Sequence, residues 1–248
     1  MFGMRNIRLT IEYEGTDYFG WQIQKRKPTV QGEITKVLER ILEEKVTLIG
    51  AARTDSGVHA LSQVANFKTR NEKLTTESFI KALNSLLPSD IVIKEVKKVT
   101  DSFHARYSAK SKIYRYQILN QSLPSALERG FSWHIPEPLH WKKIREASKY
   151  FIGKHDFSPF SVTGSSRKNK QCTVKDFKIR KAKNLYILQI EADYFLYKMV
   201  RRIVGALIEV GRGKIESEYI SPLLLKKAST LRARTAPPHG LFLIKVKY

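Results

Sequence analysis

The stretch "LIGAARTDSGVHALSQVANFK", Leu48 to Lys68, places an apolar segment on each side of a short polar loop. Its flanks, "VTLIG" and "SQVANFK", have the pattern of short strands, and the loop holds Arg53, Asp55 and His59. Taken alone, Asp55 is best explained as a turn-forming residue, because Asp side chains bond to nearby backbone and Gly57 can supply a positive φ. The rest of the chain decides whether Asp55 does more.

The elements around this loop indicate an α+β fold. Apolar alternation predicts strands, and spacing of three and four residues predicts helices, the first of which begins at Val30 with Thr29 as its N-cap. The predicted elements are a strand at 7–13, a helix from 30 to 42, strands at 46–50 and 62–68, a helix at 76–87 and a strand at 90–99. The order βαββαβ is that of a split βαβ unit with its helices on one face of the sheet.

The second half of the chain has a similar order of elements. The predicted elements are a strand at 112–120, a helix at 141–153, paired strands at 173–182 and 185–193, helices at 194–211 and 217–228, and a strand at 241–248. We therefore expect two similar split-βαβ halves, of the ferredoxin or RRM kind, with mainly antiparallel sheets joined across a central basic cleft. The expected halves are residues 1–105, which carry the Asp55 loop, and residues 106–248.

Charge indicates the class of partner. The 248 residues include 45 Lys and Arg against 23 Asp and Glu, a formal net charge of +22. Such an excess predicts a polyanionic partner, and nucleic acid before a membrane, because no apolar run reaches the roughly 18 residues of a membrane span. The first residues lead directly into a strand pattern, so no signal peptide is expected. A single cysteine, Cys172, fits a reducing cytoplasm.

Motifs for metals and nucleotides are missing from the sequence. The six histidines show no HExxH pairing, and one cysteine cannot build a thiolate zinc site. No GxxxxGK[ST] or GxGxxG occurs where a strand meets a helix, and "GRGK", Gly211 to Lys214, closes a predicted helix instead of opening one. We therefore expect no metal and no cofactor, and any chemistry has to come from Asp, Tyr, Arg and His side chains.

Motifs in register along the chain carry a resemblance to a known family. "RTDSGVHALSQV" resembles the catalytic signature of pseudouridine synthases, and the chain as a whole resembles the bacterial tRNA pseudouridine synthase A family. The likeness runs through "LTIEYEGTDYFGWQIQ", "TVQGEI", "ALNSLLPSDI", "FHARYSA", "YRY", "GKHDFSPF", "FLYKMVRRIVG" and "APPHGLFLIKVKY". The chain departs from the family at Ala52, where Gly is usual, at Ser56, where Ala is common, and at Tyr197-Lys198.

The resemblance implies an isomerase that detaches uracil from ribose and rejoins it through C5. It implies a tRNA substrate, at positions 38–40 of the anticodon stem-loop, a flipped-out uridine, no cofactor and a homodimer. Asp55 matches the family's catalytic aspartate, a role that suits a carboxylate because it is ionised at neutral pH and can both attack and leave. Attack on ribose C1′, attack on uracil C6 and a glycal route all remain open.

The resemblance also assigns roles to four further residues. Tyr114 is either a core aromatic of its strand or, as the resemblance implies, the active-site tyrosine on which the flipped uridine stacks. Arg201, grouped on one predicted helix face with Tyr194, Tyr197, Gly205 and Ile208, matches the motif arginine that should pair with Asp55. Arg53 is expected to flip the base or hold a phosphate, and His59 to be structural or an RNA contact.

Two other classes of function remain. A non-catalytic RNA-binding module would explain the charge, although the chain lacks the "RGFGFVxF" aromatic strand of an RRM. A pure assembly protein would not explain a polar Asp loop in a basic chain. The basic stretches "QKRK", "SSRKNK" within the loop 161–171, and "LRAR" with Lys226-Lys227 are candidate contacts to RNA phosphates. Any one of them alone is better explained as a solvated charge, but together they can follow an RNA stem.

Overall fold

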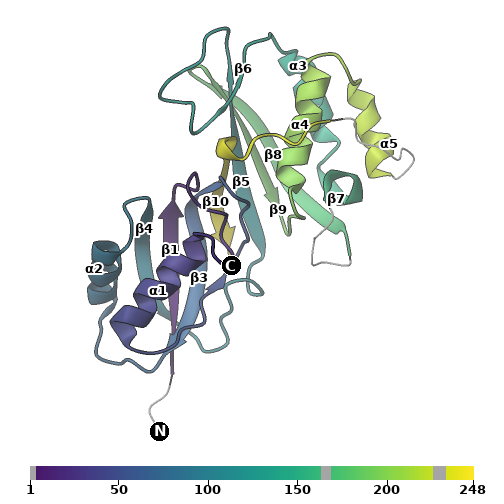
Figure 1. The fold of residues 1–248 in the computed structure, drawn as a ribbon. Coiled ribbons are helices and arrows are strands. Elements are labelled where there is room, and N and C mark those ends of the chain that lie inside the picture. The colour runs from purple at the N-terminus through teal and green to yellow at the C-terminus, as the bar shows by residue number, and fades with distance from the viewer. Residues whose placement is uncertain (1–3, 163–168, 226–232) are drawn as a thin grey trace. The chain divides into compact units, whose positions relative to one another are not determined.

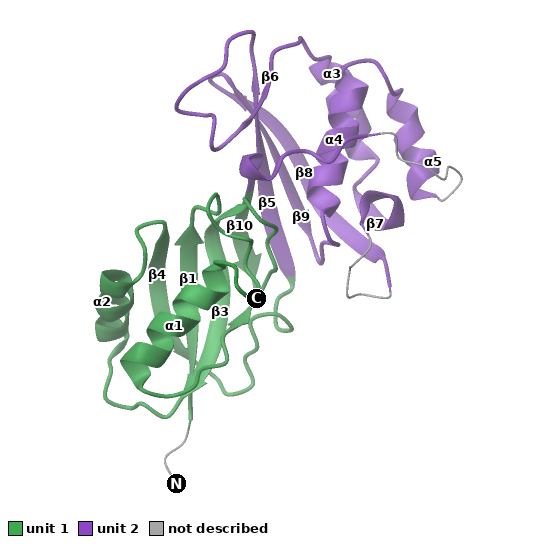
Figure 2. Ribbon diagram, viewed as in Figure 1, with its two compact units in different colours: residues 1–110, 242–248 green, residues 111–241 purple. Residues whose placement is uncertain are grey.

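The computed structural model describes residues 4–162, 169–225 and 233–248. The chain forms two compact units, Met1–Lys110 with Phe242–Tyr248 and Ser111–Leu241, which Figure 2 distinguishes by colour. Each unit combines helices with a mainly antiparallel sheet, so the α+β class is confirmed. None of the described helices has the length and apolar character that spanning a membrane requires.

The first unit is a sheet with two helices (Figure 1). Its sheet has the order β4-β1-β3-β10, with β2 paired to β3. All its pairings are antiparallel except that of β10 with β3. The elements are β1 Arg5–Tyr13, α1 Val30–Leu42, β2 Ile49–Gly50, β3 His59–Thr69, α2 Thr76–Leu86, β4 Ile91–Val99 and β10 Leu241–Lys247.

Burial of apolar side chains joins these elements into one core. Leu9 and Ile11 alternate along β1 with no exposed surface, and Leu38 of α1 is equally buried. Phe79 of α2 meets Phe67 of β3 edge to face, with ring centroids 6.2 Å apart. The start of α1 is confirmed, because the Thr29 hydroxyl accepts a hydrogen bond from the Gly32 N–H at 3.3 Å.

The last strand belongs to the first unit, whereas the sequence had grouped it with residues 106–248. Strand β10 runs parallel to β3, with Phe242 opposite His59 and Leu243 opposite Ala60. Alternation along the chain predicts that a segment is a strand, but it does not say which distant strand becomes the neighbour. The first stretch of the first unit ends at Lys110, and the second unit begins at Ser111.

The second unit has the sheet order β5-β9-β8-β7, all antiparallel, with the short β6 parallel to β5. Helices α3 and α4 pack against each other, and the indole of Trp141 in α3 stacks on the Tyr186 ring of β9. The elements are β5 Ser111–Asn120, β6 Trp133–Ile135, α3 Trp141–Lys149, β7 Gly153–Asp156, β8 Gln171–Ala182, β9 Leu185–Ala192, α4 Met199–Gly211 and α5 Ile220–Leu224.

One predicted helix in this unit has the wrong start. The expected helix 194–211 begins at Met199, because Lys198 has the left-handed backbone conformation, φ 59°. Tyr194 and Tyr197 therefore precede the helix, and the predicted helical face that grouped them with Arg201 is wrong for these two residues. The end is confirmed, since α4 stops at Gly211 and Gly213 follows with φ 72°.

Other predicted boundaries also differ from the structure. The expected helix 217–228 is a 3-10 turn, Ser217–Tyr219, followed by α5, and its last residues lie outside the described ones. Strands β6 and β7 were not predicted, because three or four residues are too short for an alternation signal. The basic stretches at 165–170 and at 226–234 lie largely or partly outside the described residues.

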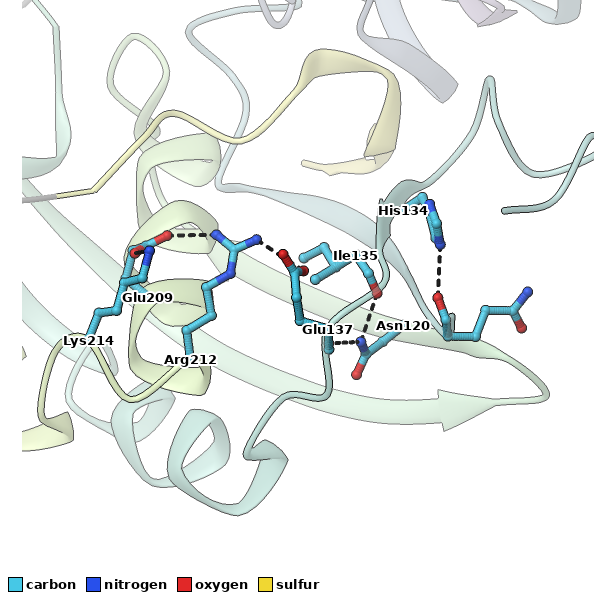
Figure 3. A network of polar contacts seen from close by, with 8 residues as sticks. Asn120, His134, Ile135, Glu137, Glu209, Arg212 and Lys214 are labelled. Atoms are coloured by element: carbon cyan, nitrogen blue, oxygen red, sulfur yellow. Dashed lines mark hydrogen bonds and ion pairs between the residues drawn. The ribbon is translucent and has the colours of Figure 1, made fainter. Parts of the chain in front are cut away.

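A polar network links Asn120 at the end of β5 to several neighbouring elements of the second unit, and Figure 3 draws its contacts with Ile135, Glu137 and Arg212. The Asn120 side-chain amide donates to the carbonyl oxygens of Ile135, at 2.9 Å, and Glu137, at 2.8 Å. Its oxygen accepts from the Trp141 indole N–H at 2.9 Å. Arg212, just after α4, forms an ion pair with the Glu137 carboxylate at 3.5 Å. The end of β5 is thereby bonded to the end of β6, to the segment that follows β6 and to the start of α3.

Candidate active site

Asp55 lies in the loop between β2 and β3 of the first unit. The Val58 N–H donates to the Asp55 carbonyl at 3.2 Å, and Gly57 has φ 74°. The turn expected from "DSG" is therefore confirmed. The Asp55 side chain is half-buried, while Arg53 and Ser56 are exposed. The loop thus holds a half-buried carboxylate, with an exposed arginine two residues away.

The segment that follows β1 supports this loop from one side. The Tyr18 carbonyl accepts hydrogen bonds from the Ser56 hydroxyl at 3.1 Å and from the Gly57 N–H at 3.4 Å. The Trp21 N–H donates to the Thr54 carbonyl at 3.1 Å. Backbone bonds on both sides of Asp55 therefore fix the path of the loop.

Two glycines allow this close approach. A Cβ atom at Gly20 would lie 2.5 Å from the Thr54 carbonyl oxygen, and Gly20 has φ +85°. A Cβ at Gly15 would overlap the Val58 carbonyl oxygen. These positions in "EGTDYFGW" need glycine because the backbone of one segment lies against that of the other.

A buried hydrogen bond anchors the residue before Asp55. The hydroxyl groups of Tyr13 and Thr54 are 2.7 Å apart, and both side chains are buried. Burial raises the pKa of the Tyr13 phenol far above its usual range, with the Thr54 hydrogen bond acting in the opposite direction. Tyr13 is therefore a neutral hydrogen-bonding group, and Thr54 points inward.

His59 is buried at the start of β3, with 2% of its surface exposed. Its Nδ1 atom accepts a hydrogen bond from the Gly15 N–H at 3.0 Å, and its ring stacks on Phe242 with centroids 4.8 Å apart. Of the two roles expected for His59, this geometry favours the structural one. His59 holds the glycine that lies against the Asp55 loop.

Tyr114 lies on β5 in the second unit, opposite Ile190 of β9. Only 7% of its surface is exposed, and the Phe195 ring meets it edge to face with centroids 4.9 Å apart. This contact fixes the plane of the phenol ring. A fixed aromatic ring suits both interpretations of Tyr114, the core residue and the stacking residue.

Arg201 is half-buried on α4 of the same unit. Its Nε–H donates to the Ala236 carbonyl at 2.8 Å, and the Ala236 N–H donates to the Arg201 carbonyl at 3.1 Å. A Cβ at Gly205, one turn further on, would overlap the Arg234 carbonyl oxygen. The segment before β10 therefore runs directly over this face of α4, and Arg201 is not a solvated surface charge.

Two residues of this region were missed by sequence reasoning. The Tyr116 hydroxyl donates to the Pro237 carbonyl at 2.8 Å, and burial raises the pKa of this phenol far above its usual range. Burial lowers the pKa of His239, and the charge of Arg201 acts in the same direction. Tyr116 stands in the motif "YRY" and His239 in the motif "APPHG". Because these motifs lie far apart in the sequence, the sequence alone does not show that they are in contact.

The candidate residues divide between the units. Arg53, Asp55 and His59 share one loop of the first unit, and Tyr114 and Arg201 lie in the second. The pairing of Asp55 with Arg201 joins different units and stays a prediction, as does the central basic cleft. Among the described residues, no three or more His, Cys, Asp and Glu side chains are gathered so that they could ligate a metal ion.

Comparison with known proteins identifies the family to which this chain belongs. A sequence model of the family described as tRNA pseudouridine synthase matches residues 9–108 and 147–248. The chain is 50% identical over 245 residues to the tRNA pseudouridine synthase A of Thermoanaerobacter sp. (strain X514), covering 99% of this chain and 100% of that protein. It is 48% identical over 245 residues, with the same coverage, to the tRNA pseudouridine synthase A of Acetivibrio thermocellus. The chain belongs to the tRNA pseudouridine synthase family, which is a family of isomerases.

Proposed function

We propose that this protein converts uridine to pseudouridine in the anticodon stem-loop of tRNA, at positions 38–40, with Asp55 as the nucleophile and without a cofactor. The observation that carries the proposal is the Asp55 loop. Its carboxylate stands on a turn whose backbone is bonded to the segment after β1 on both sides. Such a loop presents a reactive group in a fixed position.

In the proposed reaction the bond between uracil N1 and ribose C1′ breaks, and a bond between C5 and C1′ forms. The C5 hydrogen leaves as a proton, and N1 gains one, so no redox partner is needed. A carboxylate suits this exchange because it can attack an electrophilic carbon and depart once the base has turned. Attack on C1′, attack on C6 and a glycal route all use the same carboxylate.

The other candidate residues have supporting roles in this proposal. The target uridine is flipped out of the RNA and stacks on Tyr114, whose ring plane is fixed by Phe195. Arg201 pairs with the Asp55 carboxylate through its guanidinium. Arg53, exposed beside Asp55, holds a phosphate or occupies the space that the base leaves. His59 contributes by holding the loop.

The net charge of +22 supports a large phosphate-binding surface. An anticodon stem-loop is an extended shape, and we propose that two subunits bind it as a homodimer in the cytoplasm. The runner-up function is a non-catalytic RNA-binding module, which the same charge would also support.

The decisive test uses tRNA whose uridines carry a labelled hydrogen at C5. The purified protein should release this label, and the product should contain pseudouridine at positions 38–40. Release should continue after EDTA treatment of the protein, with the tRNA folded beforehand. Tight tRNA binding without any release would favour the RNA-binding module. Release that requires an added metal ion would contradict the cofactor-free part, and pseudouridine at other positions would contradict the anticodon assignment.

A further inference from the structure

Phe19 is an exposed aromatic residue on the segment that supports the Asp55 loop, with 43% of its surface exposed. The residues on either side of Phe19 either contact the Asp55 loop or are buried. The Tyr18 carbonyl binds the loop, and the position of Gly20 lies against the Thr54 carbonyl. Tyr18 and Trp21 are buried, with 5% and 1% of their surfaces exposed. Among residues 18–21, Phe19 is therefore the large side chain that reaches solvent, on a segment whose backbone is bonded to the Asp55 loop.

The backbone of Phe19 is fixed on both sides. Its N–H donates to the Pro28 carbonyl at 2.9 Å, and its carbonyl accepts from the Gln24 side-chain amide at 2.7 Å. The Val30 N–H, in the first turn of α1, donates to the Gly20 carbonyl at 3.2 Å. An exposed aromatic ring on such a backbone loses little conformational entropy when a ligand covers it.

A basic turn adjoins the ring. A bridge between Gln24 and Lys27 closes the turn around Lys25 and Arg26, and Arg26 has φ 60°. The side chains of Lys25, Arg26 and Lys27 are exposed. The Lys27 ammonium lies over one face of the Phe19 ring, 4.4 Å from its centroid, so the opposite face is the one that a base could stack on. An aromatic face and several cations are thus gathered within one short segment.

This combination suits one ligand chemistry, an unpaired nucleotide. Bases stack on exposed aromatic side chains whatever their sequence, and cations beside the ring bind the backbone phosphates. A protein that takes one base out of an RNA also has to hold the strand next to it. We propose that Phe19 is a stacking platform for an unpaired nucleotide near the target uridine, and that Lys27 and its turn bind the phosphates of that nucleotide. This inference rests on the proposed function and adds a substrate-binding element to it.

The test compares variants of Phe19 in binding to an anticodon stem-loop RNA. Phe19→Ala and Phe19→Leu remove the aromatic face and should weaken Kd by about 5-fold to 150-fold, the range found for loss of one stacked base. Phe19→Tyr keeps the face and should bind within about 2-fold of the wild type. Leu86→Ala, which removes an apolar side chain with 39% of its surface exposed at the end of α2, is the matched control and should bind like the wild type.

Salt dependence separates stacking from charge. Phe19→Ala should leave the slope of log Kd against log salt unchanged, because the ring neutralises no phosphate. Lys27→Gln should reduce that slope by about 0.7, the value for one phosphate of a single strand. Phe19→Leu shows whether lost affinity comes from the aromatic face or only from lost apolar volume.

The outcomes distinguish this inference from the proposed function. Wild-type protein that releases no C5 label from any tRNA would defeat the proposed function, whatever Phe19 does. Wild-type protein that releases label while Phe19→Leu binds RNA as tightly as the wild type would overturn the stacking role alone. Phe19→Ala that changes sedimentation of the protein but not its Kd for RNA would make the ring a protein contact and also overturn the proposal.

Discussion

Asp55 owes its position to residues that make no contact with a substrate in our proposal. Gly15 and Gly20 let the segment after β1 reach the backbone of the loop, and His59 and Tyr13 hold its two ends. The backbone that carries the Asp55 carboxylate cannot move far without breaking several of these hydrogen bonds. The chemistry of one residue therefore depends on the packing of several others.

We expect Gly20→Ala to damage the loop. The new Cβ would meet the Thr54 carbonyl at 2.5 Å, on a backbone with φ +85° that alanine adopts poorly. The free energy of unfolding should fall by about 1–3 kcal/mol, and turnover should fall by more than stability alone explains. Denaturant unfolding measures the change in the free energy of unfolding, and release of the C5 label measures the change in turnover.

Gly130→Ala is the matched control for this change. A Cβ at Gly130 would have no neighbour within 4 Å. The stability and turnover of Gly130→Ala should stay close to those of the wild type. If Gly20→Ala were as stable and as active as Gly130→Ala, the close approach of the two segments would not support the site.

We expect substitution of Arg201 to slow the reaction. Lysine keeps the positive charge but has no Nε–H for the Ala236 carbonyl and no planar guanidinium for a carboxylate. Arg201→Lys should therefore bind tRNA nearly as well as the wild type and lose at least about 10-fold in single-turnover rate, and Arg201→Ala should lose more. Wild-type rates in both variants would mean that Arg201 takes no part in the chemistry.

The type of each predicted helix and strand was correct, but several of the predicted boundaries were wrong, such as the helix expected at 141–153, which ends at Lys149 before β7 begins at Gly153. Helix α1 begins at Val30 as predicted, because apolar spacing and a Thr29 cap agree there. Helix α4 starts later than predicted, because the apolar spacing of "YFLYKMV" continues through Lys198, where the backbone turns left-handed. Sequence periodicity reports which residues are buried, and a local change of backbone conformation leaves it unaltered.

The side chain of Asn120 forms hydrogen bonds that join the elements of the second unit, and Figure 3 shows those to Ile135 and Glu137. Asn120→Ala removes three hydrogen bonds, to Ile135, Glu137 and Trp141. The part-buried Ile135 carbonyl and Trp141 indole N–H lose that partner, whereas the bond to the Glu137 carbonyl is exposed. The free energy of unfolding should fall by about 2–3 kcal/mol. Asn120→Asp keeps the acceptor for Trp141 but loses both donors, and it should also destabilise the protein.

Ser122→Ala, an exposed change two residues away, is the control and should alter stability by less than about 0.5 kcal/mol. Equal unfolding midpoints for Asn120→Ala and Ser122→Ala would show that the network contributes little. Turnover per folded molecule should stay near the wild-type value in all three variants, since the change is structural.

At the scale of the whole molecule, the family motifs carried most of the prediction of the site. The sequence motifs "RTD", "YRY" and "MVRRIVG" are enough to indicate Asp55, Tyr114 and Arg201, and the family is confirmed by comparison. The contacts that support these residues were not predictable. The placement of β10 beside β3, and of Pro237 against Tyr116, depends on pairings between distant segments that no local pattern encodes.

We propose that this protein makes pseudouridine with the Asp55 carboxylate. The most direct test is the single-turnover release of C5 label from saturating tRNA by Asp55→Asn, compared with Asp101→Asn, which changes an exposed aspartate in the same unit. We expect a folded Asp55→Asn protein that binds tRNA and releases no label above background, whereas Asp101→Asn should release label at the wild-type rate. Label release by Asp55→Asn at a measurable rate would contradict it.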